Sequence, residues 1–441
     1  MRNRTRISIP AVIILILSTA FVLRNYHLTI WPRKGATFDE YAWTWQGMSL
    51  INTGVPVSWS PHSQYKNKKL VIYQDTAFWL AKPYLEHPPL FGLIAGGFAI
   101  LRGAKSMFDI NIGTIRPLAL ILGIASVWLL YLYISQIYGR SVGSIAALLY
   151  AIVPTVVVGS RLVQNENFFI PIWLAALYVT SRFLKTGKTY LCTLAAILCG
   201  LLALAKVPWL AATLSIVLIF LYNKRYRDLM SFVTIALSIF ALYFLYGLWY
   251  DRVLFINLWK LQIARYDFTF SSIFSLWTKP YLTDRYYLDG WIYVGWGSLI
   301  ILIGNNFRKH SWILIPLLSY FLIYLAGIPD EPGHGWYRYP FYPFLITSIA
   351  VVGKEYFARN WMLTFFGLTF VLMSLLQTTW GTVFGFSYIV LRLAIISCIA
   401  VLLPIFFRRK TVNSASFSVS FLLLIFIIIL TVWSVILYNE Q

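Results

Sequence analysis

Residues 88–101 read PPLFGLIAGGFAIL, and whether this segment crosses the membrane decides the topology of the whole chain. It is an apolar run of 14 residues, bounded by Glu86-His87 on one side and Arg102 on the other. A helix needs roughly 20 apolar residues to cross a bilayer. The length therefore predicts an interfacial or re-entrant helix that does not cross.

The composition of the chain indicates a polytopic membrane protein. Of its 441 residues, 59% are hydrophobic and only 12% are charged, which is too little polar surface for a soluble globule. The net charge of +21 comes from Lys and Arg spread over short loops rather than gathered on one face. We therefore interpret the charge as a topology signal and exclude nucleic acid as a partner.

Hydropathy predicts an all-α fold with about thirteen transmembrane helices, the first of them uncleaved. The expected spans are residues 8–24, 116–137, 141–159, 167–184, 189–205, 208–222, 229–250, 291–304, 312–328, 339–353, 361–378, 387–407 and 416–438.

The distribution of charge predicts which side of the membrane each loop faces. With the amino terminus in the cytoplasm, the inner loops hold fourteen Lys and Arg residues, whereas the four short outer loops hold only Arg161, Lys206 and Arg338. This is the asymmetry that the positive-inside rule expects. Among the acids, only Asp228 and Glu355 fall inside. If residues 88–101 crossed, the pattern would invert.

Two long outer loops, residues 25–115 and 251–290, are rich in Trp, Tyr and charge and are where we expect a site. Within the first, Tyr41, Trp45 and Met48 follow helical spacing, which predicts an interfacial helix over residues 39–52 with an aromatic stripe against the membrane.

Asp39 and Glu40 would open that interfacial helix. A carboxylate is favoured at a helix amino terminus, so both acids could simply cap the helix. The functional interpretation is a general base, which needs an ionised carboxylate within hydrogen-bond reach of a nucleophile. We expect Asp39 to be this base and Glu40 to be its neighbour at the helix start.

Several further polar residues are candidates. Glu86-His87 could start a helix, touch a phosphate or help to bind a metal. Arg161 and Glu166 bound a short outer loop, where charge usually marks only a helix end. Lys206 and Arg338 are different, because an outer loop has no topological use for isolated cations. A phosphate at the membrane surface would explain them.

The chain has no Walker-type loop, His-x-x-Glu-His motif or Gly-x-Ser-x-Gly elbow, so a soluble nucleotide donor is not expected. Taken together, the polar motifs resemble the GT-C superfamily of polyprenyl-phosphate-sugar-dependent glycosyltransferases, nearest to the protein O-mannosyltransferases and the lipid A aminoarabinose transferases. The resemblance spans roughly residues 1–345 and rests on Asp39-Glu40, His87-Pro88-Pro89, Arg161 with Glu166, Lys206 after Ala205, and Arg338-Tyr339-Pro340 with Pro343.

The resemblance implies inverting transfer of a sugar from a polyprenyl-phosphate donor to an extracytoplasmic protein, lipid or glycan acceptor. It implies that Asp39 is the base, and that Lys206, Arg338 and His87 hold the phosphate. Glu166, which stands where the family often has Asp, would orient the acceptor or a basic side chain. The remaining expected substrate-binding residues are Glu40, Arg161 and Tyr339.

The resemblance also implies an enzyme of the cell envelope, integral to the plasma membrane, with its active site outside. No cofactor is required; a divalent metal at Glu86 and His87 is compatible with the sequence but is not indicated by it. Residues 1–345 would form the catalytic module, and residues 346–441 add transmembrane helices without a family motif. The alternatives are a lipid-linked glycan flippase or transporter, and a polysaccharide polymerase or ligase. The sequence identifies neither the sugar nor the acceptor.

Overall fold

The computed structural model describes residues 9–264, 270–278, 282–283, 287–327, 334–379 and 387–440. The first half contains α1 (Ile9–Asn25), α2 (Asp39–Thr53), β1 (Ser58–Trp59), β2 (Lys69–Tyr73), β3 (Thr76–Ala81), α3 (Leu90–Leu101), α4 (Ile112–Tyr138), α5 (Arg140–Ile152), α6 (Pro154–Gly159), α7 (Asn165–Thr186), α8 (Thr189–Ala203), the 3-10 helix η1 (Val207–Trp209) and α9 (Leu210–Tyr222). The second half contains α10 (Tyr226–Ala264), α11 (Phe270–Thr278), α12 (Gly290–Asn305), α13 (Phe307–Gly327), η2 (Gly335–Phe341), α14 (Tyr342–Tyr356), α15 (Trp361–Thr379), α16 (Tyr388–Ile399), η4 (Ala400–Leu402), α17 (Leu403–Phe406) and α18 (Lys410–Ile436).

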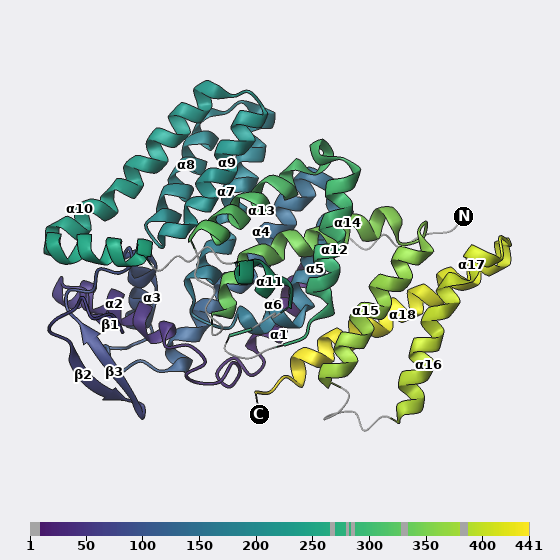
Figure 1. Cartoon of the computed structure of the whole chain (residues 1–441), viewed down its shortest axis with the longest axis horizontal. Coiled ribbons are helices and arrows are strands. Elements are labelled where there is room, and N and C mark those ends of the chain that lie inside the picture. Colours follow the sequence, from purple (N-terminus) through teal and green to yellow (C-terminus); the bar gives the residue numbers. More distant parts are fainter. Residues whose placement is uncertain are drawn as a thin grey trace.

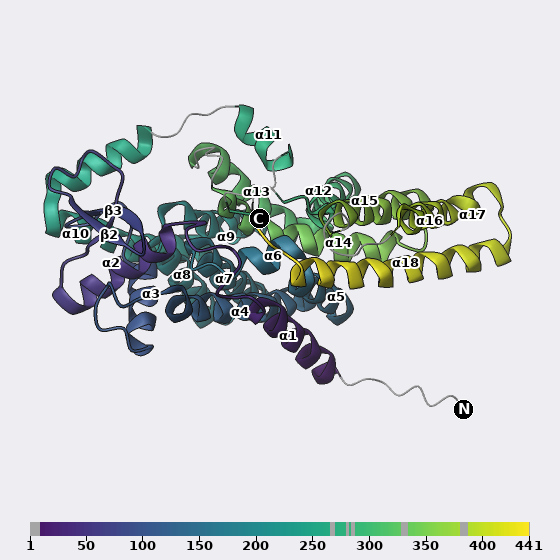
Figure 2. The ribbon, with the colours of Figure 1, turned by 90° about the horizontal axis from the view of Figure 1, so that it is seen from below.

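The helices form an elongated bundle, with the sheet, α2 and α3 at one end and α16–α18 projecting at the other (Figure 1). Figure 2 shows α18 running back along the bundle, so that the carboxyl end of the chain lies near its middle. The chain is an integral membrane protein, and the predicted all-α polytopic fold is confirmed.

In the part of the chain that the structure describes, each of the thirteen predicted spans coincides with one to three helices. Within the described residues, length and composition make six helices capable of crossing a membrane: Ile112–Tyr138, Asn165–Thr186, Tyr226–Ala264, Phe307–Gly327, Ile389–Phe406 and Lys410–Ile436. Shorter apolar helices account for most of the other segments. The count of thirteen therefore stays a prediction.

The deciding segment forms α3 from residue 90 to residue 101, and α3 packs closely along α2. The contact depends on glycine: a Cβ at Gly47 would lie 1.7 Å from the carbonyl oxygen of Gly92, and a Cβ at Gly96 would lie 2.2 Å from the backbone nitrogen of Met48. The two backbones thus touch directly. This packing links α2, which begins at Asp39, to the turn that enters α3.

A three-stranded antiparallel sheet, in the order β1-β3-β2, covers α2 and was not predicted from the sequence. Its strands are too short to produce a clear alternating pattern among the aromatic residues of the loop. Gln74 and Asp75 join β2 to β3 with φ values of 48° and 64°, as a two-residue type I′ turn requires.

The sheet changes the interpretation of the aromatic stripe on α2. Tyr41, Trp45 and Met48 are buried, and the Trp45 ring lies 4.9 Å from the ring of Phe78 on β3. The expected contact with the membrane is therefore wrong, because the stripe faces the sheet. Apolar spacing alone does not distinguish burial in protein from burial in lipid.

The second long outer loop begins inside α10. Asp251 leaves the helical conformation, with φ −162° and ψ 101°, and its Oδ1 accepts a hydrogen bond from the backbone nitrogen of Leu254. Asp251 thereby caps a new helical segment that runs to Ala264, and α10 bends sharply towards α2 (Figure 1). The predicted end of the span at residue 250 coincides with this bend.

The α2–α3 contact makes a first prediction. Gly96→Ala places a methyl group against backbone that cannot yield, so we expect the free energy of unfolding to fall by about 1–3 kcal/mol. Gly97→Ala is the matched control on the same helix, because its Cβ would meet only Ile51 Cδ1 at 3.7 Å. Titration with SDS in mixed micelles measures both, and equal stability of the two variants would contradict the close contact.

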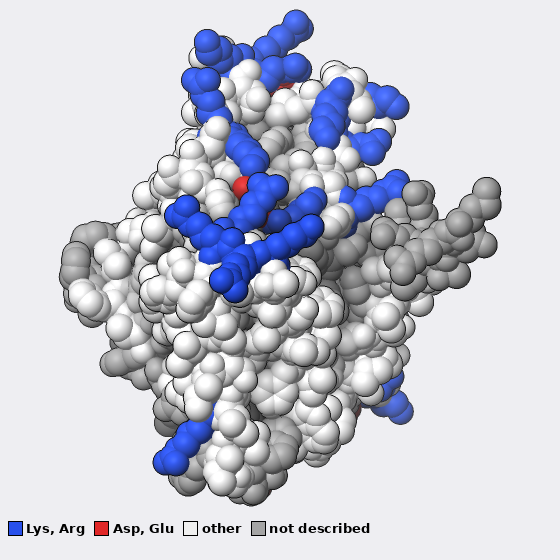
Figure 3. All heavy atoms as spheres, turned by 90° about the vertical axis from the view of Figure 1, so that its right-hand side faces the viewer, with Lys and Arg blue, Asp and Glu red and all other residues white. Residues whose placement is uncertain are grey.

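Topology gives a second prediction. Figure 3 shows Lys and Arg gathered on the upper part of one face, above a broad band with almost no charge. The three native cysteines are buried, so a single introduced cysteine dominates labelling. We expect Lys224→Cys and Lys309→Cys to react with a membrane-impermeant maleimide only from the cytoplasmic side, and Lys66→Cys only from the outer side. Labelling of position 224 or 309 from outside would overturn the proposed orientation.

Candidate active site

A cavity of about 330 Å³ opens between α2, the sheet, the turn before α3 and the bent end of α10. It brings together four of the polar residues selected from the sequence: Asp39, Glu86, His87 and Lys206. Much of the remaining lining is aromatic, from Trp43, Trp59, Tyr84, Tyr243, Trp259 and Tyr337.

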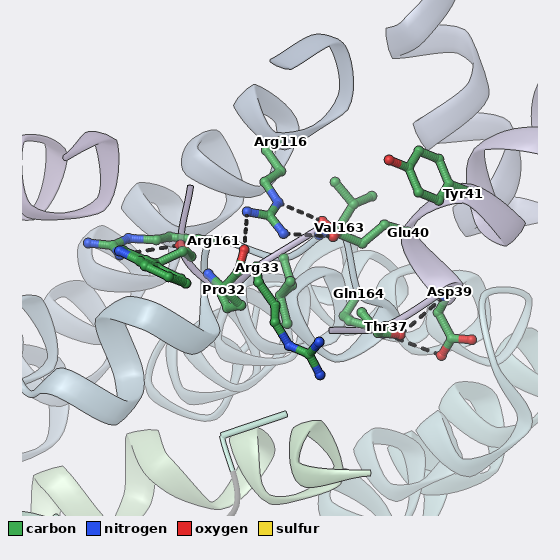
Figure 4. A network of polar contacts seen from close by, with 12 residues as sticks. Pro32, Arg33, Thr37, Asp39, Glu40, Tyr41, Arg116, Arg161, Val163 and Gln164 are labelled. Carbon is green, nitrogen blue, oxygen red and sulfur yellow. Dashed lines mark hydrogen bonds and ion pairs between the residues drawn. The ribbon is translucent and has the colours of Figure 1, made fainter. Parts of the chain in front are cut away.

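Asp39 is the first residue of α2 and is half-buried at the cavity wall. Its backbone nitrogen donates to Thr37 Oγ1, and its Oδ2 accepts a hydrogen bond from Gln164 Nε2 at 3.3 Å. Figure 4 shows the second carboxylate oxygen pointing away from Gln164. Gln164, which was not selected from the sequence, therefore holds one oxygen of Asp39 and leaves the other on the opposite side.

Glu40, the neighbouring acid, lies outside the cavity lining. It is 1% exposed and pairs with Arg116 at 2.9 Å, while its Oε1 also accepts a hydrogen bond from the backbone nitrogen of Val163 (Figure 4). Arg116 Nη1 donates to the carbonyl oxygens of Leu28 and Pro32. The two adjacent acids are thus separated, one towards the cavity and one into a buried network.

Lys206 follows α8 and reaches the cavity from the side facing Tyr337. Its Nζ pairs with Glu166 Oε1 at 2.8 Å and lies 4.5 Å from the centre of the Tyr337 ring. Burial alone would lower the pKa of Lys206, but attraction to Glu166 outweighs burial and raises it above its ordinary value. Lys206 is therefore a cation at neutral pH.

Glu166 is fully buried at the start of α7 and lies behind Lys206 rather than in the cavity lining. The neighbouring Asn165 donates from Nδ2 to the carbonyl oxygen of Ala205 at 2.9 Å. The start of α7 thus holds the turn that carries Lys206 with a hydrogen bond as well as an ion pair.

Glu86 and His87 lie on the cavity wall formed by the turn before α3. Ser60 Oγ donates to Glu86 Oε1, His62 Nε2 lies 3.6 Å from Glu86 Oε2, and the His87 ring packs on Trp43 at 4.9 Å. Among the residues that the structure describes, no group of three or more His, Cys, Asp or Glu side chains could hold a metal ion. His62 was not selected from the sequence, because nothing in the printed pattern links it to Glu86.

The other three expected binding residues are buried away from the lining. Arg161 donates to the carbonyl oxygens of Leu23 and Trp31, and burial together with repulsion from neighbouring arginines lowers its pKa to about 9. Arg338 Nη2 donates to Ser275 Oγ at 3.2 Å, and the Tyr339 hydroxyl donates to the Leu282 carbonyl. The helix η2, which contains Arg338 and Tyr339, still borders the cavity through Tyr337.

The end of the chain contacts the segment that leads into α2. Glu440 Oε2 accepts a hydrogen bond from the backbone nitrogen of Arg33 at 2.9 Å, and the Tyr438 hydroxyl donates to Glu440 Oε1. Tyr438 is buried and packs against Trp31 and Tyr287. The expected catalytic module and the carboxyl-terminal helices therefore meet beside the site.

Comparison with known proteins supports the resemblance seen in the sequence. The profile of the dolichyl-phosphate-mannose-protein mannosyltransferase family matches residues 86–250, less than half of the chain. By sequence, no curated protein matches.

Solved structures extend the comparison over the whole chain. The crystal structure of ArnT from Cupriavidus metallidurans, bound to undecaprenyl phosphate, has a TM-score of 0.58 and 14% identity, covering 96% of this chain and 77% of ArnT. Arabinosyltransferase EmbB from Mycobacterium smegmatis has a TM-score of 0.56 and 12% identity, covering 99% of this chain and 42% of EmbB. The apo oligosaccharyltransferase of Archaeoglobus fulgidus has a TM-score of 0.50 and 13% identity, covering 99% of this chain and 57% of that protein. The chain has the predicted GT-C fold.

The two neighbouring acids make a third prediction. Glu40→Gln leaves Arg116 buried without its counter-charge, so we expect the free energy of unfolding to fall by about 3–5 kcal/mol. Asp39→Asn is the matched control one residue away and should change it by less than about 1 kcal/mol, because Asp39 is only half-buried and its carboxylate is hydrogen-bonded to a neutral side chain, that of Gln164. If SDS titration finds the two variants equally stable, the structural role assigned to Glu40 is wrong.

Proposed function

We propose that the protein is a membrane glycosyltransferase that moves a sugar from a polyprenyl-phosphate donor to an extracytoplasmic acceptor. The observation that carries the proposal is a single aromatic cavity lined by both a carboxylate, Asp39, and a buried cation, Lys206. Such a pair can serve the two ends of one displacement, the incoming nucleophile and the departing phosphate. The shared fold and the partial family match support the same reaction class.

In the proposed reaction, Asp39 is the general base. An acceptor hydroxyl or amine attacks the anomeric carbon of the donor, and its proton passes to the Asp39 carboxylate as the new bond forms. The bond between the anomeric carbon and the phosphate oxygen breaks, and polyprenyl phosphate departs with the electron pair. One displacement without a covalent sugar–enzyme intermediate inverts the anomeric configuration.

Lys206 would stabilise the departing phosphate. An ammonium has three donors, and only one is used by Glu166, so the others can reach phosphate oxygens. Preorganised charge at a leaving group is often the largest catalytic contribution. His87 also lines the cavity and can add a second contact. Arg161 and Arg338 lie outside the cavity lining, so the proposal gives them no direct contact with the phosphate.

The aromatic lining suits a sugar ring. Trp43, Trp59 and Trp259 line the cavity with flat apolar rings, while Asp39 and Glu86 supply hydrogen-bond acceptors for hydroxyl groups. This combination of apolar walls and few polar groups is typical of small-molecule sites. We further propose an orientation with the amino terminus in the cytoplasm and this cavity on the outer side of the plasma membrane.

The fourth prediction tests the reaction in vesicles that contain the purified protein and a panel of polyprenyl-phosphate sugars, with products identified by mass spectrometry. We expect Asp39→Asn to reduce transfer by about 10²–10⁴-fold, as loss of a general base does. Lys206→Met, made together with Glu166→Gln to avoid an unpaired buried acid, should also reduce transfer strongly.

Asp75→Asn is the matched control, because Asp75 is an exposed acid in the β2–β3 turn and Asn tolerates its positive φ. Full activity of a folded Asp39→Asn variant would refute the assignment of the base. If no donor is consumed while a lipid-linked glycan crosses the bilayer, the flippase alternative is correct instead. A product with many added repeat units would identify a polymerase.

A further inference from the structure

The outer face of the β2–β3 hairpin is unusually apolar. A sheet with one face on the core normally presents polar side chains on the other. Here Leu70, Ile72 and Trp79 are 47%, 76% and 46% exposed, and the strand register places Leu70 opposite Trp79. An apolar face left open in this way marks an interaction surface.

The same hairpin has an open edge. Among the strands of the described residues, the order β1-β3-β2 pairs β2 on one side only. Because the two-residue turn makes Tyr73 and Thr76 a hydrogen-bonded pair, the alternation of an antiparallel ladder directs the backbone N–H and C=O groups of Leu70 and Ile72 away from β3. Backbone groups exposed along an edge can pair with an added strand.

The surroundings of the hairpin are positively charged. Lys66, Lys69 and Lys82 are exposed, whereas Asp75 is the only acid among residues 58–83. Lys68 lies 6.0 Å from the centre of the Trp79 ring, so positive charge borders the apolar face itself. This distribution complements an acidic partner and repels a basic one.

The segment that enters the hairpin contacts the wall of the cavity. Lys68 Nζ donates to the carbonyl oxygens of Ser60 and Pro61, at 3.4 and 3.2 Å. Pro61 and the adjacent His62 line the cavity, as does Trp59 on β1. A chain that pairs with β2 therefore passes Lys68, which contacts the segment that lines the cavity.

We propose that β2 docks an extended acidic polypeptide, which adds a strand at the open edge and places apolar side chains on Leu70, Ile72 and Trp79. Strand addition uses main-chain hydrogen bonds for affinity and alternate side chains for specificity. A lipid bilayer fits the apolar face and the lysines, but lipid tails offer no partners to the open backbone edge. The identification of this polypeptide as the acceptor rests on the proposed function, whereas the docking itself does not.

The test measures binding of a fluorescein-labelled peptide in which Val and Glu alternate, to the full-length protein in nanodiscs of zwitterionic lipid. We expect saturable binding, weakened at least about tenfold by Ile72→Ser with Trp79→Ser. Ile72→Pro should weaken binding more than Ile72→Ala, because it also removes an outward N–H without breaking the ladder to β3. Leu101→Ser is the control, since it changes a more exposed apolar residue outside the hairpin.

Ligand controls separate the contributions. The same peptide with Lys in place of Glu, or with alternate backbone nitrogens methylated, should bind at least about tenfold more weakly. Asp39→Asn should reduce transfer by about 10²–10⁴-fold but leave peptide binding intact, so failure of the reaction and failure of docking are distinguishable. No saturable binding, or binding unchanged by the hairpin variants, overturns the proposal. A further experiment attaches an environment-sensitive fluorophore to the cysteine of Ile72→Cys. If its emission changes in nanodiscs of anionic lipid and does not change on addition of the peptide, the apolar face contacts the bilayer and the proposal is wrong.

Discussion

The buried ion pair between Glu40 and Arg116 is the constraint on which the geometry of the site depends. The two residues are 76 positions apart and almost fully buried, and they also bind backbone groups of Leu28, Pro32 and Val163. A buried pair contributes little net stability compared with apolar residues of the same volume, but it tolerates few alternative arrangements. The pair therefore fixes the start of α2 against α4 and against the loops that contain Pro32 and Val163. This position places Asp39 in the wall of the cavity.

Four consecutive residues, 163–166, extend this constraint across the site. The backbone nitrogen of Val163 binds Glu40, and the Gln164 side chain binds Asp39. Asn165 then binds the carbonyl of Ala205, and Glu166 binds Lys206. One short segment therefore sets the positions of both Asp39 and Lys206, which the proposed reaction uses at opposite ends of the breaking and forming bonds.

Sequence reasoning found the parts of the site that carry an unusual charge, and it missed those that depend on long-range contacts. Asp39 and Lys206 stood out because charge is rare beside apolar spans. In the sequence, Arg116 indicated only the start of a predicted span. Its ion pair with Glu40, 76 positions away, leaves no local sequence pattern. Helices were predicted well because long uncharged runs are a clear signal. The strands β2 and β3 were not predicted, because they are short and lie in a loop rich in aromatic residues.

The family motifs end near residue 345, yet the contacts that hold the site continue beyond it. Glu440 binds the backbone of Arg33, which directly follows Pro32, and Pro32 accepts a hydrogen bond from Arg116. A carboxylate from the end of the chain thus joins the network that orients α2. Glu440 is nearly buried and Tyr438 packs against Trp31, so the residues that follow α18 contact the loop that leads into α2. Contacts with the backbone of a loop can be made by many different sequences. The absence of a motif after residue 345 therefore does not show that these residues are far from the candidate active site.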